Sequence, residues 1–387
     1  MTKVNKENWE YKKLGEICES IFSGGTPSRS IFSYWNGNIP WAKICDLRFM
    51  YLDKCEEFIS KEGLANSSAK IFTKGTILYS IFATIGSSSI LNIDASCNQA
   101  IAGIKLKSGL NTQFYFYVLK HLKSHFESIS KGVAQKNINL SILKNQVVPV
   151  PPIEEQNRIS SQFEEIDNLI TIKQEQLKEF DALEQSVFYK MFGDSVVKEM
   201  GWEVKSLGEI GNIITGSTPS TKDKENYEPK EYCFVKPSDL PSKGVANITT
   251  TEYFVSSKGF ALSRALPIGS VLISCIGTIG KIGILKQVAC SNQQINAIIP
   301  NRTIDSYYLA YNIAVNKNKL ESMANAPVVP IINKTSFSLF KIAIPPLTLQ
   351  QSFAQKIEVI EKQKEVVKNE IAQLQALLDS EMDKYFG

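Results

Sequence analysis

The sequence is poor in the residues from which most metal and nucleophilic sites are built. It has only two histidines, His121 and His125, and its seven cysteines are scattered singly without a CxxC pair. An odd number of isolated cysteines is typical of buried thiols in a reducing compartment, and it disfavours both disulfides and a structural zinc. The histidines lie in HLKSH, where Leu122 replaces the glutamate of a zinc-binding HExxH motif. We therefore predict no metal site, and a solvated helix face at the histidines.

Long apolar runs are missing as well. The first ten residues, MTKVNKENWE, carry charge, and the most apolar later stretch, 268–285, contains Lys281 and several glycines. No segment predicts a signal peptide or a membrane span, so we expect a cytoplasmic protein with no membrane partner. A chain of 387 residues with 43% hydrophobic residues is nevertheless large enough for two or more domains with sizeable cores.

Motifs of DNA-modifying chemistry are absent too. GTIGK (277–281) has only half of a phosphate loop, because Cys275 stands where a glycine is needed and Ile282 where a serine or threonine is needed. The sequence contains no Asp/Asn-Pro-Pro-aromatic motif of amino-methyltransferases, no glycine-rich cofactor loop and no carboxylate–lysine cluster typical of restriction nucleases. We therefore predict that the chain has no catalytic residues and binds no cofactor itself.

The chain does contain one pattern written twice. WEYKKLGEICESIFSGGTPS from Trp9 returns as WEVKSLGEIGNIITGSTPS from Trp202, about 193 residues later with one residue deleted. KGTILYSIFATIG (74–86) matches IGSVLISCIGTIG (268–280). Each copy then reaches a Pro-Pro pair and a long segment that ends in KMFG or KYFG. A period of half the chain is too long for a solenoid and predicts a tandem duplication.

Each copy changes character at its prolines. Before them, short β-branched and aromatic runs punctuated by Gly, Ser and Asn predict an irregular mixed domain that ends in a helix, near Phe114 or Ser306. After them, neither Gly nor Pro occurs for about 40 residues. We therefore predict an α+β protein. Its two globular domains, called the first and second domain below, and its two long helices span residues 1–150, 194–346, 151–193 and 347–387.

Apolar residues recur in both long helices at spacings of three and four over about four heptads, which is typical of a coiled-coil seam. Polar residues interrupt each seam, at Lys173 and Glu184 in the first helix and at Lys364 and Glu381 in the second. Interruptions at non-equivalent positions can specify register or orientation. The residues expected to pair the helices are Ile159, Phe163, Ile166, Ile170, Leu177, Phe180, Phe353, Ile357, Ile360, Val367, Ile371, Leu374 and Leu378.

The helices are therefore predicted to pair with each other as an antiparallel coiled coil. Such a pair would act as a spacer that holds the two globular domains apart. The alternative is that each helix packs only against its own domain.

Charge is distributed unevenly over these parts. Residues 1–150 carry 18 basic and 11 acidic side chains and residues 194–346 carry 16 and 12, whereas both long helices are acidic. Basic domains on an acidic spacer suit two separated contacts with a polyanion, because Lys and Arg supply most of the sequence-independent affinity for phosphates. Many solvated domains reach similar charges without a nucleic-acid role, so charge alone leaves DNA binding open.

Candidate DNA contacts come mainly from matching positions of the two copies. The TPS loops offer hydroxyls and a nearby cation on a Pro-stiffened turn, which suits phosphate contacts, although the turn can equally well only join two strands. WAK (41–43) and FVK (234–236) place a cation on the same side as an aromatic ring, either on a nucleic-acid face or over the core. The candidate residues are Thr26, Ser28, Arg29, Lys43, Lys131, Gln135, Lys136, Thr218, Ser220, Lys222, Lys236 and Lys334.

An Asn-Gln pair also recurs, as Asn98-Gln99 and Asn292-Gln293. A side-chain amide can read adenine bidentately. Because the pair is unchanged in two domains expected to read different sequences, a scaffold hydrogen bond is the preferred interpretation. Base-reading residues are expected where the copies differ, as in SRSIFSYWNGNIPW against STKDKENYEPKEYCF.

Together these motifs resemble one known family. In the first copy they are Trp9, LGEI (14–17), GGTPS (24–28) and PPIEEQ (151–156), and in the second they are Trp202, LGEI (207–210), GSTPS (216–220) and PPLTLQQ (345–351). Their order over essentially the whole chain is similar to that in the specificity subunit of type I restriction-modification enzymes, which has two target-recognition domains. One departure is that APVVP (326–330) stands before the second Pro-Pro where the first copy has KGVAQ (131–135).

The resemblance implies a DNA-binding subunit without an active site, which recruits two methyltransferase subunits and, for cleavage, restriction subunits. S-adenosylmethionine, ATP and Mg would then be bound by those partners. The expected function is recognition of an asymmetric bipartite site in double-stranded DNA. Two alternatives stay open: a stand-alone restriction-methylation enzyme, which the missing motifs disfavour, and a duplicated adaptor that binds protein or glycan instead of DNA.

Overall fold

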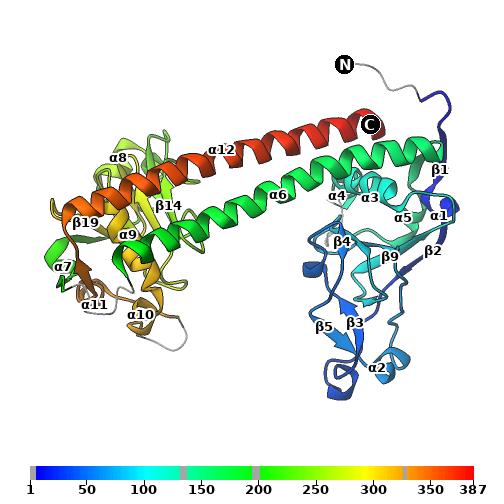
Figure 1. Ribbon diagram of the computed structural model, residues 1–387, viewed down its shortest axis with the longest axis horizontal. Helices are drawn as coiled ribbons and strands as arrows, with labels where there is room; N and C mark the ends of the chain where they lie inside the picture. The colour runs from blue at the N-terminus through cyan, green and yellow to red at the C-terminus, as the bar shows by residue number, and fades with distance from the viewer. Residues whose placement is uncertain (1–5, 131–136, 194–200, 326–328) are drawn as a thin grey trace. The chain divides into compact units, whose positions relative to one another are not determined.

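The computed structural model describes residues 6–130, 137–193, 201–325 and 329–387 (Figure 1). Contacts divide the chain into two compact units, Met1–Lys173 with Glu370–Gly387, and Gln174–Asn369. Each unit holds one globular domain together with one part of each long helix. Among the described residues, no helix is both long enough and apolar enough to cross a membrane.

In the first unit, strand β1 (Glu10–Lys13) pairs antiparallel with β10 (Val147–Val150), the strand directly before the proline pair. The chain between β1 and β10 forms two further sheets. One has five strands in the order β2-β9-β6-β7-β4, and the other has three strands in the order β5-β3-β8. Their strands are β2 (Cys18–Ser23), β3 (Ile39–Ala42), β4 (Tyr51–Leu52), β5 (Glu57–Ile59), β6 (Ile77–Ser80), β7 (Ser88–Leu91), β8 (Ser96–Cys97) and β9 (Ile101–Leu106). The helices are α1 (Leu14–Ile17), η1 (Phe32–Tyr34), η2 (Ile44–Asp46), α2 (Lys61–Ala65), α3 (Thr112–His121), α4 (Lys123–Ser130) and α5 (Leu140–Asn145).

The second unit repeats this topology. Strand β11 (Glu203–Ser206) pairs with β20 (Lys341–Ile344), and the two sheets have the orders β12-β19-β16-β17-β14 and β15-β13-β18. Their strands are β12 (Gly211–Thr215), β13 (Tyr232–Val235), β14 (Val245–Ile248), β15 (Phe254–Val255), β16 (Val271–Ser274), β17 (Ile282–Leu285), β18 (Ala289–Ser291) and β19 (Ile295–Pro300). The helices are α7 (Leu207–Ile210), η4 (Lys224–Asn226), α8 (Ser257–Ala261), α9 (Ser306–Val315), α10 (Lys317–Ser322) and α11 (Lys334–Ser338). The sequence repeat is therefore a repeat of one mixed fold, as predicted.

Strand β6 explains why the ILYS segment (77–80) shows no alternation of exposed and buried residues. All four of its residues are buried. Ile77 and Tyr79 pack into the core that includes α3, whereas Leu78 packs into a second core on the opposite face of the sheet. A strand that is covered on both faces has no polar alternation. Strand β16 is buried in the same way, between the two cores of the second domain.

A buried serine holds the turn that follows each of these strands. Ser80 Oγ donates to the carbonyl of Thr84 and accepts from the amide of Ser87, 2.8 Å away. Ser274 makes the matching two contacts in the second domain, at 2.6 and 3.0 Å. Gly86, which closes the first turn, has a φ of +91°, a backbone conformation that favours glycine. The SIFATIG and SCIGTIG motifs, including GTIGK, therefore encode a turn between two strands.

The glutamine of the PPxxEQ-type motif joins each globular domain to its long helix. The Oε1 atom of Gln156 accepts from the amide of Asn111, the N-cap of α3, and its Nε2 atom donates to the carbonyl of Pro151. Gln350 makes the same pair of contacts in the second unit, with Asp305 and Pro345. The two glutamines therefore fix which positions of the two long helices are equivalent.

The two long helices are α6 (Ile153–Phe192) and α12 (Leu347–Phe386). In the first unit the early part of α6 packs on the end of α12, where the ring centroids of Phe163 and Tyr385 are 5.8 Å apart. In the second unit the late part of α6 packs on the start of α12, where the rings of Phe188 and Phe353 are 5.5 Å apart. The helices therefore pack together and run antiparallel within each unit, as predicted.

The predicted seam follows this interface. Its members are buried at Ile159, Phe163, Ile170, Phe353, Ile357, Ile360, Val367 and Leu378, and half-buried at Ile166, Leu177, Phe180, Ile371 and Leu374. Several of them also pack against their own globular domain, because Ile159 and Phe163 share a core with Phe114 of α3. The helices thus pair with each other and also pack against the globular domains, so the alternative that each helix packs only against its own domain is wrong.

The polar interruptions of the seam make ion pairs. Lys173 Nζ lies 2.7 Å from Glu370 Oε2 in the first unit. Lys364 Nζ lies 3.1 Å from Glu184 Oε1 in the second unit, and both side chains are buried. Glu381 instead makes an ion pair within its own helix. Three of the four interruptions therefore face the partner helix.

The two units differ at the position of the buried ion pair. With Gln156 and Gln350 aligned, Ile170 of the first unit matches Lys364, and Leu378 matches Glu184. Ile170 and Leu378 are buried in one apolar cluster. The helix pair thus has an apolar layer in one unit and an ionic layer at the same place in the other.

Candidate nucleic-acid interface

The candidate residues lie mostly around the three-stranded sheet of each domain. In the first domain, β3, β5 and α2 form the end of the domain that is farthest from α6 (Figure 1). This sheet pairs Trp41 of β3 with Glu57 of β5 and, on the other side, with Ser96 of β8. In the second domain the matching pair across the strands is Phe234 with Tyr253.

The GxTPS loops are built by contacts that the two domains share. Thr26 Oγ1 donates to Gln99 Oε1, and Thr218 Oγ1 donates to Gln293 Oε1 at 2.5 Å. A Cβ atom on Gly24 would lie 2.1 Å from the carbonyl oxygen of Cys97, so no side chain fits there. These glutamines act as scaffold, which agrees with the preferred interpretation of the repeated Asn-Gln pair.

The serine of each TPS loop is exposed, whereas its proline is buried. Ser28 Oγ lies 2.8 Å from Ser30 Oγ, and both are accessible to solvent. Ser220 and Lys222 of the second domain are exposed as well. An aromatic side chain closes each loop: Trp35 Nε1 donates to the carbonyl of Ser28 at 3.0 Å, and the hydroxyl of Tyr227 donates to the carbonyl of Pro219, one position earlier in its loop, at 2.7 Å.

Lys43 is held at both its backbone and its side chain. Its amide donates to Asp46 Oδ2 at 2.7 Å, and its Nζ atom lies 2.9 Å from Glu57 Oε1 and 3.3 Å from Glu56 Oε2. The hydrogen bond to Glu57 raises the pKa of Lys43 above its usual value, so the amine stays charged. Partial burial would raise the pKa of Glu57, but the contacts with Lys43 and Arg29 outweigh it and lower that pKa.

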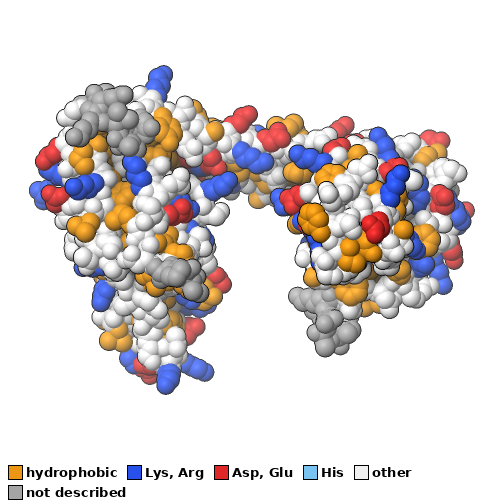
Figure 2. Space-filling view, turned by 90° about the horizontal axis from the view of Figure 1, so that it is seen from below, with side chains coloured by type: hydrophobic (Ala, Val, Ile, Leu, Met, Phe, Trp, Pro, Cys, Tyr) orange, Lys and Arg blue, Asp and Glu red, His pale blue; other side chains and the backbone are white. Residues whose placement is uncertain are grey.

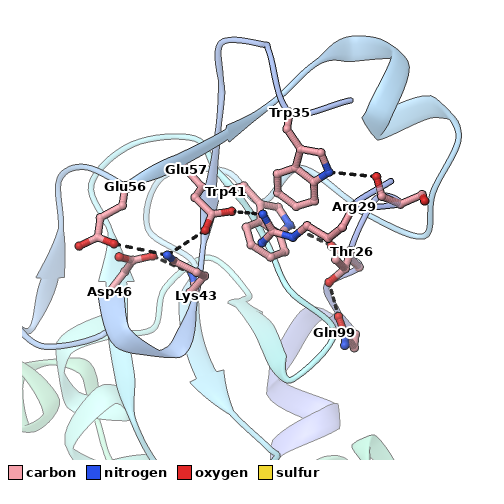
Figure 3. Close-up of polar contacts among 11 residues, drawn as sticks. Thr26, Arg29, Trp35, Trp41, Lys43, Asp46, Glu56, Glu57 and Gln99 are labelled. Atoms are coloured by element: carbon pink, nitrogen blue, oxygen red, sulfur yellow. Dashed lines mark hydrogen bonds and ion pairs between the residues drawn. The ribbon is translucent and has the colours of Figure 1, made fainter. Parts of the chain in front are cut away.

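Arg29 joins Lys43, Asp46, Glu56 and Glu57 in one group of charged side chains, called the Glu57 cluster below. Its Nη1 atom lies 2.6 Å from Glu57 Oε2, so that Glu57 bridges Arg29 and Lys43 (Figure 3). The guanidinium carbon lies 3.6 Å from the ring centroid of Trp35 and 5.1 Å from that of Trp41. The indole of Trp41 is buried and donates to the carbonyl of Gly25, which makes it part of the core under the cluster.

The second domain keeps the scaffold of this cluster but not its charges. The amide of Lys236 donates to Asp239 Oδ2 at 2.7 Å, as that of Lys43 does to Asp46. Its Nζ atom, however, lies 3.1 Å from the ring centroid of Tyr253, which occupies the place of Glu57. The lysine is therefore stabilised by an aromatic face in one domain and by carboxylates in the other.

Other candidates lie elsewhere. Lys334 is exposed at the first turn of α11, outside the three-stranded sheet. Lys131, Gln135 and Lys136 lie outside the residues that the structure describes. His121 does not face solvent alone, as the sequence suggested, because its ring lies 5.7 Å from that of Phe386 and its Nδ1 atom 3.5 Å from Asp383 Oδ1.

Sequence reasoning missed the residues that orient the cations. Glu57 and Trp35 stand 28 and 6 residues from Arg29, and no motif links the three. The strand register of β3 and β5 brings Glu57 opposite Trp41. A signal existed only in the alternation of β3, which places Trp41 and Lys43 on the same side of the strand.

Side chains of metal-ligating type meet at one place in the first domain. Cys45, Asp46 and Glu56 have ligand atoms within 4.8 Å of one another. The carboxylates of Asp46 and Glu56 are already engaged by the amide and the Nζ atom of Lys43. Their arrangement is therefore accounted for by the lysine that they hold.

The long helices also present surface of their own. A groove of about 920 Å³ in the second unit lies between the β14 region and α12, and five lysines line it together with four carboxylates. Val359 and Val366 of α12 are 60% and 52% exposed, and their spacing of seven places them on one face of the helix.

On the faces seen in Figure 2, Lys and Arg side chains are interspersed with acidic and apolar ones. Charge alone therefore marks no single patch on these faces.

Comparisons with known proteins identify the repeated unit. A model of the type I restriction modification DNA specificity domain matches the chain twice, over residues 6–181 and over residues 199–376. These two matches follow the sequence repeat, and each includes one globular domain with most of the long helix that follows it.

Several described proteins are similar over one or both copies. The type I restriction enzyme MjaIX specificity subunit of Methanocaldococcus jannaschii is 30% identical over 56% of this chain and 55% of its own length. The putative MjaX specificity subunit of the same organism is 24% identical over 95% of this chain and 90% of its length. The EcoR124I/EcoR124II specificity subunit of Escherichia coli is 28% identical over 41% of each protein. The first alignment thus spans about half of that relative's length, and the second spans nearly all of it.

Two solved structures share the fold over nearly the full chain. The S subunit of a type I restriction-modification system from M. genitalium has a TM-score of 0.55 and 16% identity, and covers 100% of this chain and 98% of that one. A chain from a study of complex assembly and conformational transition of the type I R-M system has a TM-score of 0.59 and 18% identity, with 99% and 98% covered. The duplicated architecture with two long helices is therefore shared with these proteins.

Proposed function

Because the chain belongs to the family of type I restriction-modification DNA specificity domains and carries that domain twice, we propose that it recognises an asymmetric bipartite site in double-stranded DNA. Each globular domain binds one half-site, and the antiparallel helices set the distance between the half-sites. The chain contributes no catalytic residues to the complex.

One observation carries this proposal. The two domains share their scaffold contacts, such as Thr26 with Gln99 and Thr218 with Gln293, but differ in the side chains above that scaffold. Glu57 and Tyr253 occupy the same place in the two three-stranded sheets and differ in charge and shape. A common frame with unlike exposed residues suits two readers of different base sequences.

The helices are the proposed docking surface for partner subunits. Val359 and Val366 form an exposed apolar stripe on α12, and large exposed apolar side chains on a helix face favour association with another protein. The partners would be two methyltransferase subunits, joined by restriction subunits for cleavage. S-adenosylmethionine, ATP and Mg would be bound by those partners and not by this chain.

Selection from a random duplex library tests the proposal directly. The full chain, assembled with its methyltransferase, should enrich two short defined half-sites that are separated by an undefined spacer of fixed length. The affinity should fall steeply with added salt, because phosphate contacts release counterions. Absence of any selected sequence would favour the adaptor alternative.

A second measurement addresses the enzymatic alternative. The purified chain, incubated alone with duplex DNA and labelled S-adenosylmethionine, should transfer no methyl group. Transfer that depends on this chain in the absence of a methyltransferase would contradict a non-catalytic recognition subunit.

A further inference from the structure

The cluster around Glu57 is more ordered than contacts to DNA phosphates require. Arg29 has one edge on the carboxylate of Glu57 and one face on the ring of Trp35, and yet its side chain is 54% exposed. Fixing a guanidinium in this way removes rotamer freedom before any ligand is bound, so that less entropy is lost on binding. The remaining N–H donors of Arg29 form a planar fork, which matches two acceptors side by side.

The charge of the cluster argues against a phosphate as its ligand. Two cations, Arg29 and Lys43, stand beside three carboxylates, those of Asp46, Glu56 and Glu57, so the cluster has no excess of positive charge. Glu57 lies 2.6 Å from the guanidinium and would repel an approaching phosphate. The O6 and N7 atoms of guanine are acceptors without a net charge, so a neighbouring carboxylate repels them much less than it repels a phosphate.

The second domain has no arginine held between a carboxylate and an aromatic ring at the equivalent positions. The two loops can be aligned by a shared contact: the carbonyls of Tyr34 and Asn226 each accept from the amide of the serine that caps the following short helix, at 2.9 and 3.0 Å. Tyr34 and Asn226 also each stand six positions after the serine of their TPS motif. On that alignment Thr221 stands in the place of Arg29. The arginine is therefore not part of the shared scaffold.

The order of the cluster, its lack of excess positive charge and its absence from the second domain all indicate that Arg29 contacts a base rather than a phosphate. We propose that Arg29, held by Glu57 and Trp35, reads a guanine in the half-site bound by the first domain, with its N–H donors directed to the O6 and N7 atoms of that base. Bidentate contact of arginine with guanine is the commonest specific contact in the major groove. The proposal rests on the proposed function, because it requires that the first domain binds a DNA half-site.

The test uses the full chain assembled with its methyltransferase. Binding is measured against duplexes in which each position of the selected site is changed in turn to the other three bases. Arg29→Ala should reduce the preference for one G·C pair in one half-site by about 5- to 150-fold. It should leave the other half-site and the dependence of affinity on salt unchanged. Arg29→Lys should retain part of the preference, because a lysine can still reach the guanine acceptors.

Two further variants make the assignment specific. Glu57→Gln removes the carboxylate that orients Arg29 but keeps its size, and should weaken the same G·C preference to a smaller extent. Thr221→Ala, at the matching place of the second domain, should leave that preference intact. Thermal unfolding of each variant checks that the first domain remains folded.

Two outcomes would overturn the assignment while leaving the proposed function standing. The first is that Arg29→Ala weakens binding equally for all sequences and lowers the salt slope by about one, which identifies a phosphate contact. The second is that it changes no base preference at all, which identifies a purely structural role. Failure of the unmodified complex to select any sequence would instead contradict the proposed function itself.

Discussion

Lys364 Nζ lies 3.1 Å from Glu184 Oε1 at a position where both side chains are buried between α6 and α12. Asp181 and Glu361 also contact Lys364, at 2.9 and 2.8 Å, and Tyr311 of α9 lies beside Glu184. Three carboxylates thus surround one amine. Burial, followed by the contact with Glu361, raises the pKa of Glu184 to about 7 even though Lys364 opposes the shift.

The raised pKa of Glu184 predicts a pH-dependent stability of the second unit. A carboxyl whose folded pKa exceeds its unfolded value contributes stability below the unfolded pKa, and that contribution is lost as pH rises through the folded pKa. The free energy of unfolding should therefore fall by about 1 to 3 kcal/mol between pH 4.5 and pH 8 through this group. Glu184→Gln should flatten this dependence in thermal or urea unfolding. An unchanged pH profile in that variant would show that Glu184 does not carry the effect.

The apolar layer of the first unit provides a matched substitution for the ionic layer of the second. Lys364→Ile alone leaves buried carboxylates without their cation and should cost about 3 to 5 kcal/mol of stability. The double variant with Glu184→Leu copies the Ile170–Leu378 layer and should recover most of that loss. Urea unfolding of the single and double variants measures both effects. Equal loss in the two variants would mean that Glu184 is not the group left uncompensated.

The shared glutamines should stabilise the loops without choosing bases. Gln99→Ala and Gln293→Ala each remove the acceptor of a threonine hydroxyl, and each should cost about 1 kcal/mol. Both variants should select the same DNA sequence as the parent chain. A changed base preference at one half-site would instead make the glutamine of that domain a reader.

Helix length should control the spacing of the half-sites. Because α6 and α12 are paired, seven residues would be inserted in both, after Lys173 and before Glu370, which keeps the seam in register. The insertion adds about 10 Å to the pair and should lengthen the undefined spacer by about two or three base pairs. Library selection reads the spacer and both half-sites together. Altered half-sites with an unaltered spacer would refute the role of the helices as a spacer.

The exposed stripe on α12 should matter for assembly rather than for folding. Val359→Glu with Val366→Glu should weaken co-purification of the methyltransferase by at least tenfold, while stability changes by less than about 1 kcal/mol. Val288→Glu, at a position that is 44% exposed on the second domain, is the matched control. Equal assembly of the two variants would place the docking surface elsewhere.

The sequence was most informative where a pattern repeats along the chain. The repeat predicted two domains of one topology, and the heptad spacing predicted that Phe163 and Phe353 lie in the seam between the two long helices, with Lys364 as a polar interruption. Such features depend on local periodicity and on the comparison of two copies. They could therefore be read without knowledge of the fold.

The candidate interface was less predictable, because it depends on strand register. Arg29, Lys43 and Glu57 come from a loop, the end of a strand and a second strand, and only the pairing of β3 with β5 brings them together. Lys43 is matched by Lys236, but Thr221 and Tyr253 stand in the places of Arg29 and Glu57, so comparison of the copies gave no signal for the cluster as a whole. The divergence expected of base-reading residues also removes the pattern from which a contact could be inferred.

The pairing of β1 with β10, and of β11 with β20, has a consequence for how such chains can recombine. Glu10 lies opposite Val150, and Glu203 lies opposite Ile344, so each globular domain begins and ends at neighbouring points beside its helix. A domain from a relative could be exchanged between these points as a cassette, without cutting the α6–α12 interface. New pairs of half-sites could then arise by a single genetic exchange, with the helix frame inherited intact.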